Sequence, residues 1–235
     1  MTAIAAPERR AELAANLAKV ERDISAACAR AGRTRSEVTL VAVTKTWPAS
    51  DAACLRDLGV TDLAENRDQE ACQKAAAVTG VRWHFVGSVQ TNKARSVASY
   101  ADVVHSVDRL SLVDALSKGA ERADRTLEIF LQVSLDDDPS RGGARPAEVL
   151  ALADRVQSSS GLSLVGVMAV APIGEDPRQA FERLRRIAAD LVAVHPDARL
   201  ISAGMSGDLE AAIAAGSTHV RVGTAVLGHR SPMLR

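Results

Sequence analysis

The sequence has few cysteines, no long apolar run and no net charge. The three cysteines, Cys28, Cys54 and Cys72, show no CxxC spacing, which speaks against a disulfide framework or a zinc site and predicts buried, reduced thiols in a cytoplasmic protein. No window approaches the roughly 18 uninterrupted apolar residues of a membrane span, so we expect no membrane partner. The 29 basic residues balance the 29 acidic ones, which argues against broad electrostatic binding to nucleic acid or to an anionic membrane.

The amino-terminal stretch also lacks the apolar segment of a signal peptide, because charged residues interrupt it every few positions. Its apolar residues recur at steps of three and four, and Gly32 follows as a stop signal. We therefore expect residues 1–32 to form an amphipathic helix that packs on the rest of the chain. The residues of its apolar stripe are Leu13, Leu17, Val20, Ile24 and Cys28.

After residue 32, short β-rich runs alternate with longer segments of helical period. This alternation, with nearly continuous hydrophobic strands, is typical of a parallel sheet covered on both faces. The expected strands are 38–44, 61–65, 82–86, 102–107, 127–134, 162–170, 199–205 and 218–226, and the expected helices include 50–58, 69–78, 108–123, 146–159, 176–194 and 207–216. Eight strands favour a (β/α)8 TIM-type barrel with an extra N-terminal helix, the chain 1–235 being a single domain. A doubly wound open sheet is the alternative, and residues 135–146 form the one loop with clear flexibility.

Lysine is scarce, since only five of the 29 basic residues are Lys. One of them, Lys45, ends the β-branched run VTLVAVT. Unlike a guanidinium, an amine can lose its proton and attack a carbonyl group. The alternative is a lysine that extends from a buried strand to solvent.

Other polar residues also fall at the predicted carboxyl ends of strands, the face on which barrels carry their active sites. We therefore expect a ligand site on this face. The residues are Lys45, Glu65, Asn66, His84, Gly87, His105, Asp108, Met168, Met205, Ser206, Arg221, Gly223 and Thr224.

The last two strands are followed by the elements of a phosphate site. Ser206 and Gly207 precede a predicted helix, and Gly223 and Thr224 end the eighth strand. Loops after strands seven and eight are a recurrent phosphate site in barrels, although Ser206 could be a plain N-cap and Gly223 a turn. A lysine and a phosphate site on one cavity are the two groups that hold pyridoxal 5′-phosphate (PLP).

Two histidines, His84 and His105, could be ligands, but interior histidines that are merely hydrogen-bonded are commoner. No HExxH or similar spacing is present, so we expect no metal.

Seven stretches, in order and spanning residues 38 to 230, resemble the YggS/PROSC family of pyridoxal phosphate homeostasis proteins. They are VAVTKTWP, AENRDQE, WHFVGSVQTNKAR, HSVDR, GVMAVAP, GMSGDLEAAIAAGSTHVRVGTAVLG and HR. Three departures from the family pattern are Ala64, where glycine is usual, Trp47, where a lysine or a similar residue is usual, and Ala203-Gly204, where Met-Gly is common.

The resemblance implies a barrel like the amino-terminal domain of alanine racemase, with PLP bound covalently and no established catalysis. It implies a cytoplasmic role in buffering PLP or delivering it, with PLP-dependent apo-enzymes as partners. Carried over by motif, Lys45 forms the Schiff base, and Arg221 resembles the arginine that faces the pyridine nitrogen in the racemase. The remaining implied cofactor contacts are Asn66 and His84 along the ring pocket, Ser206, Gly223 and Thr224 at the phosphate, and Met205 beside it.

A racemase-like PLP enzyme is the alternative function, and a structural or scaffold role without ligand is the third. A two-base racemase needs a second acid or base opposite the lysine, typically a tyrosine. The only tyrosine, Tyr100, precedes the fourth strand and is expected on the opposite rim. An arginine at the ring nitrogen also weakens the ring as an electron sink. We therefore favour a non-catalytic binding protein, and we expect a monomer because no exposed hydrophobic stripe demands a dimer.

Overall fold

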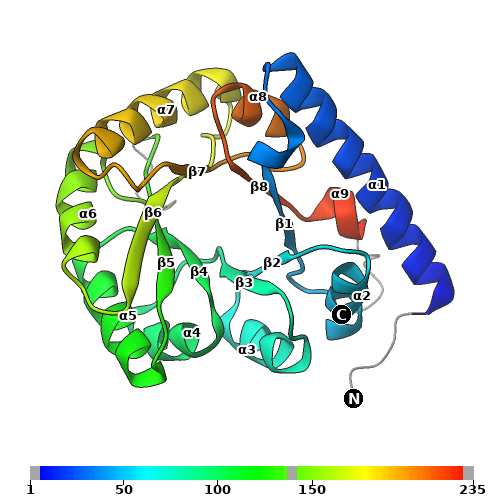
Figure 1. The fold of residues 1–235 in the computed structure, drawn as a ribbon, viewed down its shortest axis with the longest axis horizontal. Coiled ribbons are helices and arrows are strands. Elements are labelled where there is room, and N and C mark those ends of the chain that lie inside the picture. The colour runs from blue at the N-terminus through cyan, green and yellow to red at the C-terminus, as the bar shows by residue number, and fades with distance from the viewer. Residues whose placement is uncertain (1–5, 137–141, 230–235) are drawn as a thin grey trace.

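A computed structural model describes residues 6–136 and 142–229. The first five residues of the expected N-terminal helix, and residues 137–141 of the loop expected to be flexible, lie outside the described residues. Within the described part, eight parallel strands close into a barrel in sequence order, β1 to β8, so that β1 pairs with both β2 and β8 (Figure 1). The expected (β/α)8 barrel is confirmed. The strands are β1 Thr39–Val43, β2 Asp62–Glu65, β3 Arg82–Phe85, β4 Val103–Val107, β5 Leu127–Gln132, β6 Leu162–Met168, β7 Leu200–Ser202 and β8 His219–Val222.

The helices form a ring around the barrel (Figure 1). They are α1 Pro7–Arg30, α2 Ala49–Asp57, α3 Asp68–Ala77, α4 Ala94–Tyr100, α5 Leu110–Ala123, α6 Val149–Gln157, α7 Pro177–Val194, α8 Leu209–Ala214 and α9 Thr224–Leu227, with 3-10 turns η1 Arg35–Glu37, η2 Thr91–Lys93 and η3 Pro146–Glu148. Among these described residues, no helix has both the length and the apolar character that a membrane span needs.

Two expectations need correction. The expected strand 218–226 ends at Val222, and the residues after Gly223 form the short helix α9. The β-branched residues there do not extend the sheet, because Val226 and Leu227 pack in the core cluster that also contains residues of α1. Cys72 is exposed on α3, whereas Cys28 and Cys54 are buried as expected, and all three are free thiols.

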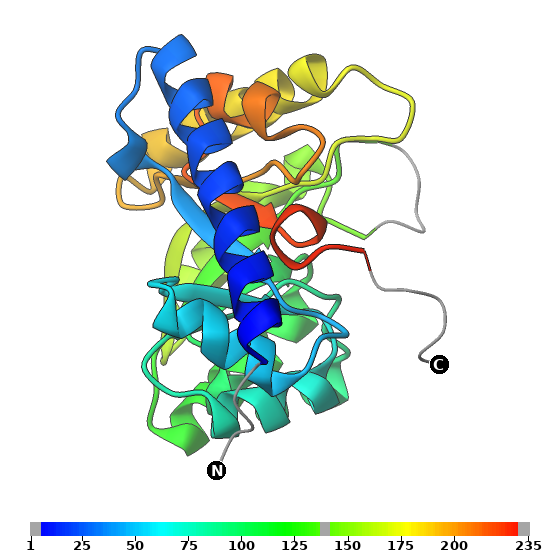
Figure 2. The same cartoon turned by 90° about the vertical axis from the view of Figure 1, so that its right-hand side faces the viewer.

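Helix α1 lies across the outside of the barrel and next to α9 (Figure 2). It begins at Pro7, a favoured first helical residue because its missing N–H would have no partner there. All of its predicted apolar stripe is buried except Leu17, which is half-buried in the same cluster. Two of its polar side chains also bond to the backbone of α9: Asn16 Nδ2 donates to Val226 O at 3.1 Å, and Arg9 Nη2 donates to Leu227 O at 2.9 Å. The N-terminal helix therefore helps to fix the position of α9.

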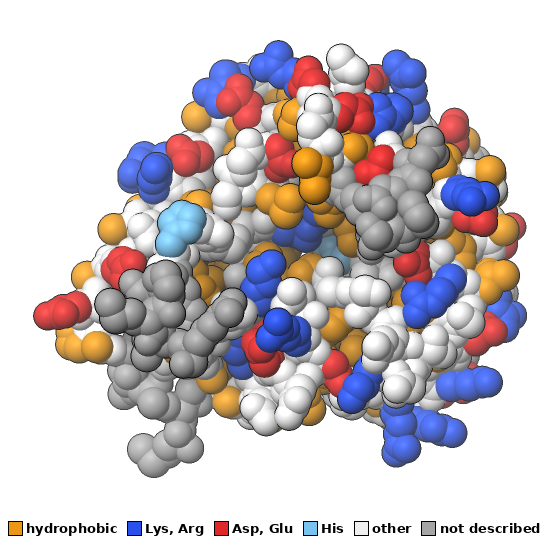
Figure 3. Space-filling model, turned by 180° about the vertical axis from the view of Figure 1, so that it is seen from behind, with side chains coloured by type: hydrophobic (Ala, Val, Ile, Leu, Met, Phe, Trp, Pro, Cys, Tyr) orange, Lys and Arg blue, Asp and Glu red, His pale blue; other side chains and the backbone are white. Residues whose placement is uncertain are grey.

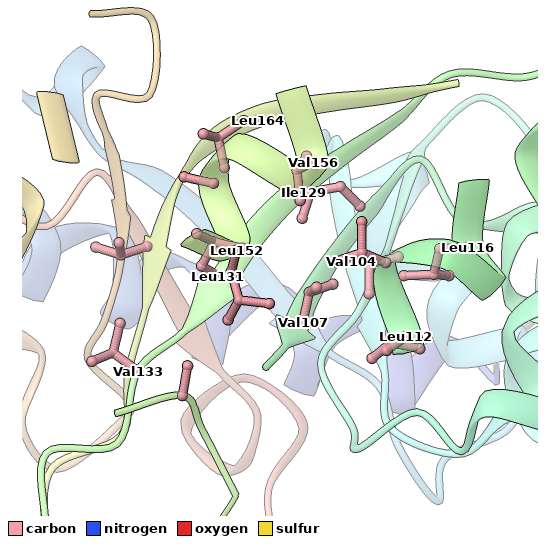
Figure 4. Packing of buried hydrophobic residues seen from close by; sticks show 14 of the residues in the cluster. Val104, Val107, Leu112, Leu116, Ile129, Leu131, Val133, Leu152, Val156 and Leu164 are labelled. Atoms are coloured by element: carbon pink, nitrogen blue, oxygen red, sulfur yellow. The ribbon is translucent and has the colours of Figure 1, made fainter. Parts of the chain in front are cut away.

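Alternation along the strands separates two apolar layers. In β1, Leu40 and Ala42 pack outward against helices, whereas Val41 and Val43 belong to a cluster inside the barrel; successive strand residues point to opposite faces. The largest outer cluster lies between β4, β5 and β6 and helices α5 and α6 (Figure 4). Full burial of each such Val, Leu or Ile side chain contributes about 1.5–3 kcal/mol. These layers hold the carboxyl ends of the strands in a fixed ring.

Candidate functional site

A cavity of about 510 Å³ opens at the carboxyl ends of the strands. Seen from this side, the face is hollowed near its centre, with Lys or Arg side chains at the floor (Figure 3). Val43, Val86, Met168 and Val170 supply apolar walls. Seven of the eight residues expected at a cofactor line this cavity: Lys45, Asn66, Met205, Ser206, Arg221, Gly223 and Thr224.

Lys45 lies two residues beyond the end of β1 and is exposed to the cavity. It is the only lysine among the lining residues, and no described residue bonds to its Nζ. The next residue, Thr46, has a φ of 68°, a left-handed conformation that is costly for a β-branched side chain. The backbone N–H of Thr46 donates to Glu70 Oε2 at 3.1 Å. The loop that carries Lys45 is therefore held in one conformation by a contact from α3.

A buried ion pair supports this loop from below. Lys74 Nζ lies 2.5 Å from Glu65 Oε1 and donates to Thr44 O at 2.7 Å, and Thr44 Oγ1 donates to the same carboxylate oxygen. Burial raises the pKa of Glu65, against the opposing effects of Lys74 and Thr44. Removing one member of such a pair leaves an uncompensated buried charge. Lys74 thus ties α3 to the residue before Lys45, a role that its place in a helix did not reveal in the sequence.

The loops after β7 and β8 form a cluster of unused backbone donors. The N–H groups of Ser206, Gly207, Gly223 and Thr224 have no acceptor among the described residues, and all four residues line the cavity. Asp208 Oδ1 accepts the Met205 N–H at 2.5 Å and so closes the turn that carries Ser206 and Gly207. Grouped backbone N–H donors of this kind suit a phosphate.

Arg221 lies at the inner end of the cavity and is 5% exposed. Its guanidinium donates to Ser202 Oγ at 2.6 Å and to Ala169 O at 3.0 Å. Burial lowers the pKa of Arg221 to about 10, so the group remains a cation at neutral pH. It presents a fixed donor to the cavity.

Asn66 lines the cavity after β2, and its Oδ1 is buried without a hydrogen-bond partner among the described residues. Orphaned buried polar atoms are uncommon and call for an explanation, and this one belongs to a residue that lines the cavity. The side-chain amide is therefore available to a bound molecule.

His84 is not among the lining residues. It is 1% exposed inside the barrel, where Nε2 lies 2.8 Å from Asp62 Oδ1 and Nδ1 lies 2.8 Å from His105 Nε2. His84 is the third residue of a four-residue strand, so it stops short of the rim. Both histidines have the contacts that the alternative interpretation predicts: they are interior side chains held by hydrogen bonds.

One titratable lining residue was not expected from its chemistry. His229 lines the cavity, although in the sequence it stood out only through the dipeptide HR of the family motif.

Tyr100 lies at the end of α4, outside the lining, and its hydroxyl donates to Asp68 Oδ1 at 3.2 Å. Burial and Asp68 raise the pKa of Tyr100 far above its ordinary value. Among the described residues, no cluster of histidine, cysteine or carboxylate side chains suits a metal ion.

The cavity therefore combines one unpaired amine, a set of backbone donors for an anion and a buried arginine. An amine can condense with an aldehyde, the donors can hold a phosphate, and the apolar walls can accept a flat ring. These residues fit the lysine, phosphate and ring-nitrogen contacts of PLP.

Comparison with known proteins gives the same picture. The family model "Alanine racemase, N-terminal domain" matches residues 15–231. A protein of Mycobacterium leprae named "Pyridoxal phosphate homeostasis protein" is 42% identical over 241 residues, covering 94% of each chain, and one of Escherichia coli with the same name is 42% identical over 228 residues, covering 93% of this chain and 97% of its own. The solved structure of PipY from Synechococcus elongatus, with PLP bound, has a TM-score of 0.80 and 32% identity, and covers 92% of this chain and 100% of its own. The chain belongs to the pyridoxal phosphate homeostasis proteins, within the alanine racemase N-terminal domain family.

Proposed function

We propose that this chain binds PLP as a Schiff base on Lys45 and serves PLP homeostasis in the cytoplasm, by buffering the cofactor or delivering it to apo-enzymes. The observation that carries the proposal is the position of Lys45. Among the described residues it is the one lysine on a cavity where the loops after β7 and β8 present four backbone N–H groups without a described acceptor. The related PipY structure, solved with PLP, supports the choice of ligand.

In this proposal each group has one task. Lys45 supplies the amine, while the donors at Ser206, Gly207, Gly223 and Thr224 hold the phosphate, with Met205 beside it. Asn66 and Arg221 contact the ring. PLP supplies an aldehyde for the covalent link and a ring that can act as an electron sink.

A weak PLP enzyme is the second candidate function. Arg221 speaks against transamination, because most PLP chemistry uses a carboxylate at the ring nitrogen to keep the ring protonated, but it leaves racemisation open, since the resemblance matches it to the arginine of alanine racemase. Tyr100, the tyrosine that could be a second base, is bonded to Asp68 away from the cavity. We therefore propose a non-catalytic protein. His229 lines the cavity and is the residue that could serve as the second base, so we test it directly.

The first test is the near-visible absorbance of the purified protein, followed by borohydride reduction and peptide mass mapping. We expect a bound chromophore whose reduced adduct maps to Lys45. Lys45→Ala should abolish the adduct and leave only weak phosphate-anchored binding, whereas Lys93→Ala, which removes an exposed lysine outside the cavity, should retain it. A full adduct in the Lys45 variant would refute the site.

A second test separates carrier from enzyme. The loaded protein is incubated with amino acids in deuterated water, and exchange of the α-proton is followed by NMR. A carrier should give no exchange above free PLP, and it should transfer PLP to an apo-enzyme faster than PLP dissociates into solution. Exchange that is lost in His229→Asn would establish the enzyme instead.

We further propose that residues 1–235 act as one domain and as a monomer. Helix α1 shares a core cluster with β1, β8 and α9, so we expect its removal to unfold the barrel. Light scattering of the eluted protein should give a mass near 24.7 kDa.

A further inference from the structure

The barrel interior contains a continuous line of polar side chains. Interiors of this fold are ordinarily filled by layers of Val, Ile and Leu. Here five buried polar residues on β2, β3, β4, β7 and β8 follow one another at hydrogen-bond distance, from the amino-terminal end of the barrel to the cavity: Asp62, His84, His105, Ser202 and Arg221. We call these five residues the axial chain.

The cavity end of the axial chain has a defined direction. Arg221 Nη1 can only donate, so Ser202 Oγ accepts this bond at 2.6 Å. Ser202 Oγ also lies 2.9 Å from His105 Nδ1. Among the described residues, no other group is placed to accept the Ser202 proton. Every atom here is satisfied only if the Ser202 hydroxyl donates to an unprotonated Nδ1 of His105.

The same logic fixes both histidines. With Nδ1 as an acceptor, a neutral His105 carries its proton on Nε2 and donates it to His84 Nδ1 at 2.8 Å. A neutral His84 then carries its proton on Nε2 and donates it to Asp62 Oδ1 at 2.8 Å. All bonds run in one direction, from a cation at the cavity to a carboxylate at the far end.

The surroundings favour this state. Burial lowers the pKa of His105 well below its ordinary value, and the nearby His84, Arg221, His219 and Arg82 add to this effect. Burial alone would raise the pKa of Asp62, but hydrogen bonds from His84 and Thr61 bring it below its ordinary value. His105 is therefore neutral, and its neighbour His84 is bonded to an ionised Asp62.

The opposite direction leaves a defect. If His84 carried both protons, it would donate to His105 Nε2, and His105 would then donate from Nδ1 to Ser202. The Ser202 hydroxyl would have no acceptor among the described residues. An unsatisfied buried donor is costly, so the structure distinguishes the two directions.

We propose that Ser202, His105 and His84 are positioning residues for Arg221, and that Asp62 sets the direction of the axial chain. Bonds in a chain polarise one another, so Ser202 Oγ becomes a stronger acceptor and holds the guanidinium in one orientation toward the cavity. The contact of Arg221 with the pyridine nitrogen rests on the proposed function, whereas the proton arrangement is a property of the chain without ligand.

The first experiment reads that arrangement in the PLP-free protein. Two-bond ¹H–¹⁵N correlation NMR near neutral pH distinguishes the Nε2–H tautomer, the Nδ1–H tautomer and the charged ring. We expect both His84 and His105 as neutral Nε2–H tautomers. A charged His84, or an Nδ1–H tautomer of His105, would overturn the proposal whether or not PLP binds.

The second experiment changes the far end of the axial chain. In Asp62→Asn the side chain can donate as well as accept, so the preferred direction is lost. We expect mixed tautomers of both histidines and a PLP dissociation constant about two- to threefold higher, although residue 62 does not line the cavity. Glu128→Gln is the matched control. It removes a carboxylate that pairs with Arg82, the arginine also 4.0 Å from Asp62, but it leaves the axial chain intact.

Ser202→Ala cuts the axial chain next to Arg221. We expect a roughly tenfold weaker PLP affinity, the scale of a lost hydrogen bond to a charged group, with partial loss of the Nε2–H tautomer of His105. If wild-type protein binds PLP and both variants bind it equally well with unchanged tautomers, the axial chain has no positioning role and the proposed function stands. If wild type binds no PLP, the proposed function fails, and the tautomers alone decide the proton arrangement.

Discussion

Lys45 shows how much the function of a residue depends on its immediate neighbours. A lysine after a buried strand commonly extends to solvent. Here Thr46 is held at a positive φ and Glu70 binds its N–H, so the loop carries conformational strain of about 1–3 kcal/mol. Strain of this kind persists where surrounding structure over-determines it, and in this loop the result is a fixed starting point for the Lys45 side chain.

Thr224 tests the phosphate side of the cavity at the scale of one hydroxyl. Thr224→Ala should weaken PLP binding by about 1–3 kcal/mol, because a hydrogen bond to a charged phosphate is lost. Thr224→Ser retains the hydroxyl and should bind nearly as wild type. Equilibrium dialysis of PLP measures both. Equal dissociation constants for the alanine variant and wild type would remove the Thr224 hydroxyl from the phosphate contacts and leave only its backbone N–H, which both proteins carry.

At this scale the sequence predicted which residues share a cavity better than how deep each one lies. Strand ends can be placed from pattern, and seven of the eight expected residues line one cavity. His84 was placed too near the rim because it lies inside β3 and not at its end, and its ring bonds to Asp62 and His105 within the barrel. The pairing of Ser202 with Arg221 joins residues from different strands, and no local pattern reports it.

Among the elements, the turn after β7 has a backbone requirement that only glycine meets. Gly204 has a φ of 92°, and a Cβ there would lie 2.7 Å from Ala212 Cβ on α8. Its carbonyl also accepts the Arg221 N–H at 2.9 Å. This single position links the turn of Ser206, the helix α8 and the strand that carries Arg221.

A matched pair of glycines tests this link. Gly216 has a similar φ of 96°, but a Cβ there would meet no heavy atom within 4 Å. Gly216→Ala should lower the free energy of unfolding by about 1 kcal/mol, the cost of the positive φ. Gly204→Ala should lower it by about 2–4 kcal/mol, because steric overlap adds to that cost. Urea unfolding measures both losses. Equal losses would show that α8 shifts to make room for the added Cβ with no further loss in the free energy of unfolding.

Elements were predicted where a regular period runs long enough. The eight strands and α1 follow from alternation and from the apolar stripe. Helix α4 was not among the expected helices, and α9 was assigned to a strand. In α9 the local residues favour β structure, and packing beside α1 overrides that preference, as tertiary contacts often do.

For the whole molecule, the buried histidines predict a loss of stability in mild acid. Burial lowers the pKa of His219 to about 4, and the nearby His84, Arg82 and Arg221 contribute in the same direction, with Asp62 opposing. The unfolded chain takes up this proton near its ordinary pKa of about 6.5. Between these two values the unfolded state binds more protons than the folded state, so the free energy of unfolding falls as the pH falls.

The size of this effect follows from the pKa difference. We expect His219 to account for about 2 kcal/mol of lost stability between about pH 7 and about pH 5. Urea unfolding of wild type and His219→Asn across this range measures it, and the difference between the two proteins cancels the opposite contribution of Glu65, whose raised pKa makes the folded state take up a proton. The variant should show the shallower pH dependence. Parallel curves would mean that His219 accepts a proton in the folded barrel as readily as in the unfolded chain. Burial would then not lower the pKa of His219.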